Sequence, residues 1–136
     1  MTSLADDVVA IQNVKARYCY AVDRLAEDPE AARKVLDEVF LPDAVGYYGA
    51  GPLQGGDALA EFLCVAIAAN SEWRVHMIHS PLIDVEGDTA SAGWTVMVHL
   101  KRRGGAVDIL LGRYADSFRR TPEGWRIASV RFERQE

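Results

Sequence analysis

Residues 76–90 read HMIHSPLIDVEGDTA, and this stretch decides the fold that the sequence predicts. A largely apolar, extended run ends at the turn 86–88, EGD, and a second extended run begins directly after it. Turns with glycine at 103–105 and 122–124 separate two more runs of the same kind. Turns this short cannot hold a crossover helix, so the strands must form an antiparallel meander. The predicted strands cover residues 74–85, 89–102, 106–120 and 124–134.

The segment before residue 74 has helical rather than strand periodicity. Apolar residues recur every three or four positions over residues 4–26, which predicts a long amphipathic helix. Lys15 projects onto the apolar face of this helix and is expected to need a way out to solvent. Residues 28–30, DPE, are typical of a helix start, because an N-cap side chain precedes a proline at the first helical position. A second helix is therefore predicted from there to a point before Pro42.

A glycine-rich loop connects these helices to a third one. Residues 45–48 form a short extended run, the loop GAGPLQGG follows, and Asp57 can cap a helix that runs to about Ala69. Three helices followed by antiparallel strands predict an α+β fold in which the helices cover one face of a curved sheet. Such a sheet, closed by helices, makes a cone-shaped α+β barrel whose mouth can hold a ligand.

Length and composition limit the class of protein. With 136 residues, of which 49% are hydrophobic, we expect residues 1–136 to form a single domain. The net charge of -5 disfavours nucleic acid as a partner. The N-terminus does not resemble a signal peptide and no run reaches the roughly 18 apolar residues of a membrane span, so we expect no membrane partner and a cytoplasmic location. Cys19 and Cys64 lie among apolar residues of predicted helices, and we expect neither a disulfide nor cysteine chemistry.

Five segments, in this order, are similar to those of a known family. They are IQNVKARYCYAVD, FLPDAVGYYG, GGDALAEFL, HMIHSPLIDVEGDTA and GRYADSFRRTPEGWRI. Over nearly its whole length the chain resembles the SnoaL-like branch of the nuclear transport factor 2-like superfamily. The resemblance implies the cone-shaped fold. Because that superfamily includes dehydratases, a dehydrochlorinase, polyketide cyclases, a ketosteroid isomerase and non-catalytic members, the fold alone does not imply one function.

The resemblance also implies an acid–histidine pair. The dehydratases and the dehydrochlorinase pair an acid near the end of the first helix with a histidine near the start of the first long strand, and the matching residues are Asp23 and His76. Bile acid 7α-dehydratase has a tyrosine five residues before the acid, which corresponds to Tyr18. Scytalone dehydratase has a tyrosine directly before the acid, where this chain has Val22. The resemblance thus implies Asp23, His76 and Tyr18 as catalytic residues.

Taken alone, His76 and His79 could be metal ligands, a proton-transfer site or ordinary residues of a sheet. They are an odd number of residues apart and project from opposite faces of a strand, so they could not share an ion and we expect no metal site. Both faces are largely apolar, so alternation does not decide which histidine faces the cone. Asp23 lies about 40° beyond the apolar face of its helix, and such an acid is more often solvated. An acid placed beside His76 would favour proton transfer.

Alternation along the predicted strands gives an apolar wall with a few hydroxyl groups. The residues that we expect to bind the substrate are Tyr48, Trp94, Val96, Val98, Tyr114 and Phe132. Such a wall suits a small, mostly hydrophobic, cyclic substrate. His99 has the opposite parity and is expected to face away. No glycine-rich phosphate loop follows a strand, so we expect no cofactor.

These patterns and the resemblance favour a cofactor-independent lyase of the dehydratase type. His76 would be the general base, Asp23 would hold its other ring nitrogen, and Tyr18, with Tyr48, would donate to a substrate oxygen. The alternatives are an isomerase or polyketide cyclase with the same pair, or a non-catalytic ligand-binding or dimerisation module. The runs at 94–100 and 107–112 carry apolar residues on both faces, so we expect a homodimer through the outer face of the sheet.

Overall fold

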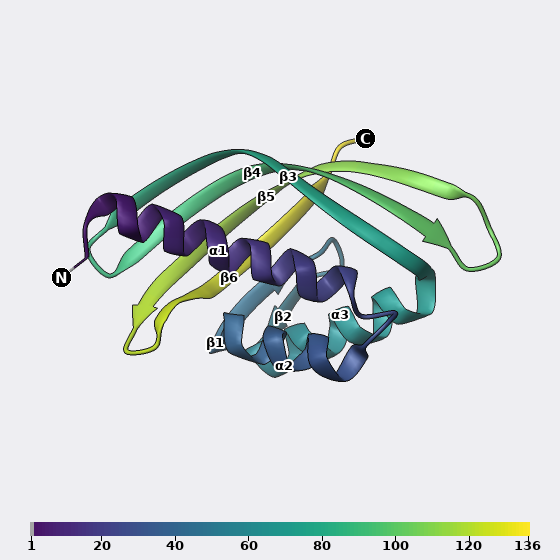
Figure 1. The fold of residues 1–136 in the computed structure, drawn as a ribbon, viewed down its shortest axis with the longest axis horizontal. Coiled ribbons are helices and arrows are strands. Elements are labelled where there is room, and N and C mark those ends of the chain that lie inside the picture. The colour runs from purple at the N-terminus through teal and green to yellow at the C-terminus, as the bar shows by residue number, and fades with distance from the viewer. Residues whose placement is uncertain (1) are drawn as a thin grey trace.

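The computed structural model describes residues 2–136, in which three helices lie against a curved, unclosed sheet of six strands (Figure 1). The helices are α1 (Leu4–Asp23), α2 (Pro29–Val39) and α3 (Gly56–Asn70). The strands are β1 (Phe40–Tyr47), β2 (Pro52–Gln54), β3 (Ser71–Glu86), β4 (Thr89–Arg102), β5 (Val107–Thr121) and β6 (Gly124–Arg134). They are ordered β2-β1-β6-β5-β4-β3 across the sheet. The predicted α+β class and its curved sheet are confirmed.

The four long strands pair antiparallel in sequence order, as their short turns predict. The sequence did not predict how the sheet continues beyond β6. There β1 runs parallel to β6, and β2, which we expected to be loop, pairs antiparallel with β1. These pairings join segments that are far apart in the chain, and no local pattern encodes them.

The helix starts follow local capping rules in two of three cases. Ser3 caps α1 through a capping box with Asp6, and Asp28 caps α2 with proline at the first helical position. The prediction that Asp57 caps α3 was wrong. The N-cap is Gly55, which has no side chain to cap the helix. The chain enters α3 with a positive φ of 97° at this residue, a backbone conformation that glycine adopts without strain.

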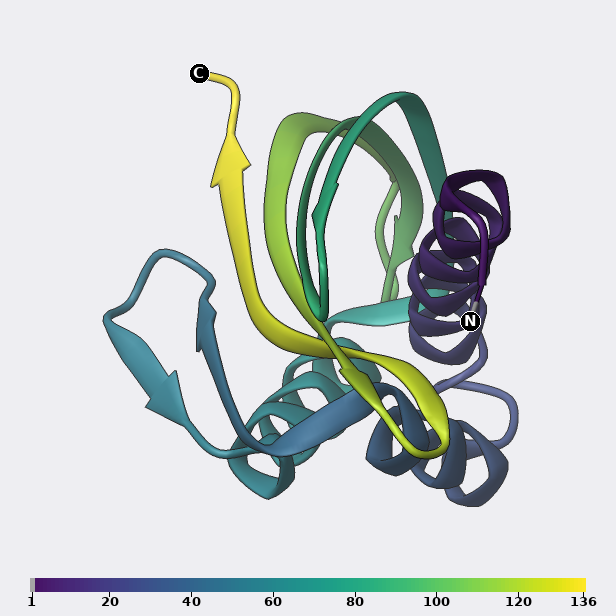
Figure 2. The same ribbon diagram turned by 90° about the vertical axis from the view of Figure 1, so that its left-hand side faces the viewer.

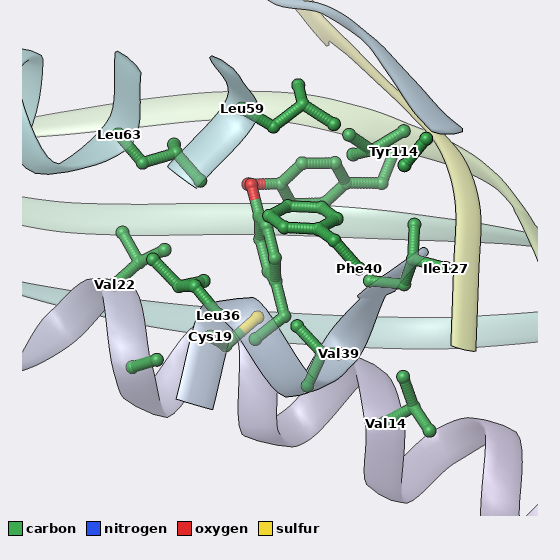
Figure 3. Close-up of a cluster of buried hydrophobic side chains, with 14 of the residues drawn as sticks. Val14, Cys19, Val22, Leu36, Val39, Phe40, Leu59, Leu63, Tyr114 and Ile127 are labelled. Carbon is green, nitrogen blue, oxygen red and sulfur yellow. The ribbon is translucent and has the colours of Figure 1, made fainter. Parts of the chain in front are cut away.

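Each helix has a separate place around the sheet (Figure 2). α1 packs against β3 and β6, whereas α3 packs against β1, and α2 packs against both other helices. Residues from all three helices and from β1, β5 and β6 meet in the core, among them Val14, Leu36, Phe40, Leu59, Tyr114 and Ile127 (Figure 3). Within residues 2–136, no helix is long and apolar enough to cross a membrane.

Lys15 does not reach solvent, contrary to our expectation. Its side chain is fully buried, and its Nζ lies 3.1 Å from Oδ2 of Asp116 on β5. The indole of Trp94 donates to the same carboxylate oxygen at 2.8 Å, and Nζ lies 3.4 Å from the centre of the Tyr114 ring. The inward-facing carboxylate of Asp116 and the face of the Tyr114 ring thus take the place of solvent around the ammonium group of Lys15.

An irregularity in β3 changes which residues face inward. The pairing with β4 shifts between His79 and Leu82, and Ser80 within the shift has a φ of 51°. Strict alternation groups Leu82 with His76, but Leu82 is 74% exposed, whereas Ile83 packs against the core. The shift comes after His76, so the side of the sheet on which that histidine lies is unaffected.

Candidate active site

A cavity of about 220 Å³ lies where the C-terminal half of α1 and α3 face the inner side of the sheet. Among the residues predicted from the sequence, it is lined by Tyr18, Tyr48, His76, Val98, Tyr114 and Phe132. A larger hollow of about 620 Å³ lies near the turn between β3 and β4. The smaller cavity is the stronger candidate for a catalytic site, because it combines an apolar wall with a histidine and several hydroxyl groups.

Asp23, the last residue of α1, reaches inward and holds His76. Its Oδ1 lies 2.6 Å from Nδ1 of the imidazole, and its two oxygens also accept hydrogen bonds from the backbone N–H of His76 at 3.1 and 3.0 Å. The side chains of His76 and Asp23 are 4% and 16% exposed, respectively. The carboxylate therefore fixes both the strand and the ring, and leaves Nε2 as the ring nitrogen available to the cavity that His76 lines.

The electrostatic surroundings of His76 favour its neutral form. Burial lowers the pKa of its imidazole below the ordinary value, and the positive charge of Arg74 acts in the same direction, whereas Asp23 opposes the shift. At neutral pH the ring is therefore uncharged, with a proton on Nδ1 directed at Asp23 and a lone pair on Nε2. This is the form in which an imidazole can accept a proton from a ligand.

Three tyrosines line the same cavity as His76, of which Tyr18 and Tyr114 are buried and Tyr48 is partly buried. The hydroxyls of Tyr18 and Tyr48 lie 2.7 Å apart, and the Tyr114 ring packs edge-on against that of Tyr18. Burial raises the pKa of all three phenols, so they stay protonated at neutral pH. Two hydroxyls that share one hydrogen bond retain one unused O–H hydrogen, so this pair can donate to an oxygen atom of a ligand.

The structure does not bring every predicted residue to this cavity. Trp94 and Val96 are buried but do not line it. A strand rises by about 6.6 Å for every two residues, so Val96 and then Trp94 lie progressively further from the cavity than Val98 does. Trp94 lies deepest, where its indole contacts Asp116 of the Lys15–Asp116 pair. His79 is exposed, and His99 contacts Met97 rather than the cavity, as its parity predicts.

Arg74 was missed by the sequence reasoning, although it lines the cavity. It lies two residues before His76 on β3, so alternation alone places both side chains on one face. Residues of α3, Phe62 and Ile67 among them, close the other side and carry only the signal of an apolar helix face.

Two further features bear on the chemistry of the chain. Cys19 and Cys64 are free, and burial raises the pKa of the Cys19 thiol to about 12, so its reactive thiolate is not populated at neutral pH. Within residues 2–136, no three histidine, cysteine or acidic side chains gather closely enough to hold a metal ion.

Comparison with known proteins gives the family and the fold. The model of the SnoaL-like domain family matches residues 3–131. An uncharacterized protein of Mycobacterium tuberculosis, Rv2910c, is 31% identical over 132 residues, which cover 93% of this chain and 86% of the relative. The family match includes all the cavity residues except Phe132.

Solved structures show the same arrangement of helices and strands. A candidate aromatic ring hydroxylase from Novosphingobium aromaticivorans superposes with a TM-score of 0.86 at 27% identity, covering 99% of this chain and 93% of that one. A hexachlorocyclohexane dehydrochlorinase of type 2 superposes with a TM-score of 0.85 at 14% identity, covering 97% and 87%. At that lower identity the likeness concerns the fold alone.

Proposed function

This chain belongs to the SnoaL-like domain family, and from that premise we propose that it is a cofactor-independent lyase acting on a small, hydrophobic cyclic compound. The observation that carries the proposal is His76, held through Nδ1 and its backbone by Asp23, in the wall of a largely apolar cavity. A buried base with a fixed tautomer suits removal of a proton from carbon.

The proposed reaction is an elimination. Nε2 of His76 takes a proton from a ring carbon, and the electron pair of that C–H bond forms a double bond as the leaving group departs with its own pair. Asp23 stabilises the imidazolium that forms, and the Tyr18–Tyr48 pair donates to a carbonyl or leaving oxygen. The imidazolium then returns its proton to the leaving group, so that hydroxide leaves as water and His76 becomes neutral again.

The size of the cavity limits the substrate. A dry protein cavity of about 150 Å³ holds benzene. A volume of about 220 Å³ therefore suits one six-membered ring with a few substituent atoms. The name of one structural relative at 27% identity, a candidate aromatic ring hydroxylase, agrees with a cyclic ligand. An elimination on a compound of this kind is therefore the reaction that we propose for this chain.

Solvent deuterium tests the proposal. Cyclic alcohols, enones and halides are incubated with the protein in heavy water, and products are followed by NMR and mass spectrometry. Loss of water or halide that requires His76 supports a lyase. Deuterium exchange or double-bond migration without a leaving group would instead indicate an isomerase, and ring closure a cyclase. Binding without exchange in any compound would contradict catalysis and favour a ligand-binding module.

A further inference from the structure

Arg74 places a positive charge in the cavity wall beside the proposed base. It lies on β3 two residues before His76, and both side chains line the cavity. Two residues along a strand span about 6.6 Å, and Arg74 is the one nearer the start of β3. A ligand that reaches His76 therefore lies within reach of the guanidinium as well.

In the part of the chain that the structure describes, the guanidinium of Arg74 has no ion pair of the kind that Arg33 and Arg120 form. Its Nε is buried and has no hydrogen-bond partner among residues 2–136. Arg33 and Arg120, by contrast, form ion pairs with Asp37 and Asp7 at 3.1 and 2.8 Å. Asp23, the acid that shares the site with Arg74, is already hydrogen-bonded to the His76 ring, with its Oδ1 2.6 Å from Nδ1. Within residues 2–136 the terminal N–H groups of Arg74 form no hydrogen bond or ion pair, so they can donate to a ligand in the cavity that Arg74 lines.

A half-buried cation without an ion-pair partner is costly, and an anionic ligand would reduce that cost. Burial lowers the pKa of Arg74, although the nearby Asp23 carboxylate acts in the opposite direction. A guanidinium offers parallel N–H donors whose geometry matches a carboxylate, and such charge-assisted pairs are stronger than neutral hydrogen bonds. The aromatic wall of Tyr114 and Phe132 is available for the rest of the ligand.

We propose that the cavity selects a small cyclic carboxylate, whose carboxylate group pairs with Arg74 while its ring packs on Tyr114 and Phe132 with a ring carbon at His76. This inference rests on the proposed function for the role of His76, but the carboxylate site itself depends only on Arg74 and the cavity. Arg74 is then a specificity-determining residue. Burial and, to a smaller extent, the charge of Arg74 lower the pKa of His76, and a bound carboxylate offsets the second of these, so binding strengthens the base.

Binding of a matched pair of ligands tests the carboxylate site. Benzoate and benzamide have nearly the same size and differ in charge, and calorimetric titration of the full chain at neutral pH measures both. We expect benzoate to bind at least about tenfold more tightly than benzamide, as for a charge-assisted pair relative to a neutral one. Equal affinities, or no binding of benzoate at millimolar concentrations, would overturn the inference.

Variants then assign the preference to one side chain. Arg74→Gln should lower benzoate affinity by about tenfold or more and change benzamide affinity by less than about twofold, since only the charged pair is lost. Arg17→Gln removes an equal charge from an exposed position on α1 and should change neither affinity. Arg74→Lys keeps the charge without the planar fork and should retain part of the preference, which keeps the test decisive should the glutamine variant fold poorly.

Two outcomes separate this inference from the proposed function. If carboxylates bind through Arg74 but no cyclic compound exchanges deuterium, the site stands and the lyase does not. If neutral enones or halides react through His76 with no effect of Arg74→Gln, the lyase stands and the carboxylate site is refuted. A second readout is the pKa of His76 followed by NMR, which should rise on binding benzoate and stay unchanged with benzamide.

Discussion

Asp23 contacts His76 through the main chain as well as the ring, and a chance surface ion pair does not have this double contact. The carboxylate accepts the backbone N–H and the Nδ1 proton of one residue, so it joins the end of α1 to the start of β3 and orients the imidazole. Replacing the acid therefore changes the position of the base as well as its charge.

The acid and the histidine should behave as one unit on mutation. We expect Asp23→Asn and His76→Gln each to lower turnover by a factor on the order of 100 or more. The first no longer fixes the tautomer of the imidazole, and the second removes the base. The double variant should lose little beyond the worse single one. Steady-state kinetics on the compound found by the deuterium screen measure these effects.

His79 is the matched control on the same strand. Its side chain is exposed on the other face of the sheet, so His79→Gln should keep most of the activity. Circular dichroism of every variant separates lost chemistry from lost folding. An inactive His79→Gln beside a fully active His76→Gln would refute the assigned base.

The pH profile should report His76. Burial holds the pKa of the His76 imidazole below the ordinary value of about 6.5. As the pH is lowered, kcat/KM should therefore decrease with a midpoint below that value. Asp23 opposes this shift, so the residual activity of Asp23→Asn should show a limb moved to still lower pH. A limb above the ordinary value in the natural chain would show that His76 is charged at rest, contrary to the proposed mechanism.

The imidazole of His76 should also make the stability of the fold depend on pH. The unfolded chain binds the His76 proton more readily than the folded chain does. The free energy of unfolding is therefore unaffected by this group above about pH 6.5 and decreases as pH falls from there towards the lower pKa of the folded state. Urea titrations of the natural chain and of His76→Gln across this window should differ in slope in that direction.

At the scale of elements, local patterns predicted what local interactions determine. The Asp28–Pro29 start of α2 and the antiparallel meander follow from caps and short turns. The inward side of β3 could be predicted as far as His76 only with the family, because both of its faces are apolar. Beyond His79 the register shift reverses the parity that strict alternation gives to Leu82 and Ile83, and Pro81 within the shifted stretch is the local sequence signal for it.

The candidate site depended on contacts of longer range. Tyr48 meets Tyr18 because β1 pairs in parallel with β6, which no periodicity predicts. Trp94 was expected in the ligand wall on parity alone, but Asp116 engages its indole deeper in the core. Parity therefore predicts the face on which a residue lies and not its depth along the cone.

The buried pair between α1 and β5 should be strongly coupled. Asp116→Asn leaves the ammonium of Lys15 without a counter-charge and should reduce the free energy of unfolding by about 3–5 kcal/mol. Lys15→Met combined with Asp116→Asn should cost less than the sum of the two single changes, because no buried charge remains. Urea unfolding of the four chains measures this coupling, and simple additivity would contradict it.

An exposed ion pair is the control for that cycle. Arg119 and Asp43 lie 2.8 Å apart, with side chains 46% and 71% exposed. Asp43→Asn should change the free energy of unfolding by less than about 1 kcal/mol, because solvent screens the pair. A comparable loss at both sites would mean that burial does not govern the effect at Lys15.

At the scale of the whole molecule, the helices leave the outer face of the sheet uncovered. Val75, Met77, Met97, Ile109 and Leu111 lie on this face, and we call them the outer apolar patch. Met77 pairs with Met97, and Met97 with Leu111, so the patch crosses three neighbouring strands. Val75, Ile109 and Leu111 are 46%, 56% and 50% exposed, which is unusual for a contiguous group of large apolar side chains.

We propose that a second copy of the chain covers the outer apolar patch, whose five side chains are all uncharged. Light scattering at micromolar concentration should then give twice the 15.0 kDa mass of one chain. Ile109→Glu places two symmetry-related charges in that interface and should yield monomers with an unchanged fold, because its side chain points away from the core. Val65→Glu alters an exposed apolar residue of α3 and should leave the dimer intact. A natural chain that stays monomeric would refute the dimer itself. A Val65→Glu variant that dissociates as readily as Ile109→Glu would refute the assignment of the interface to the sheet.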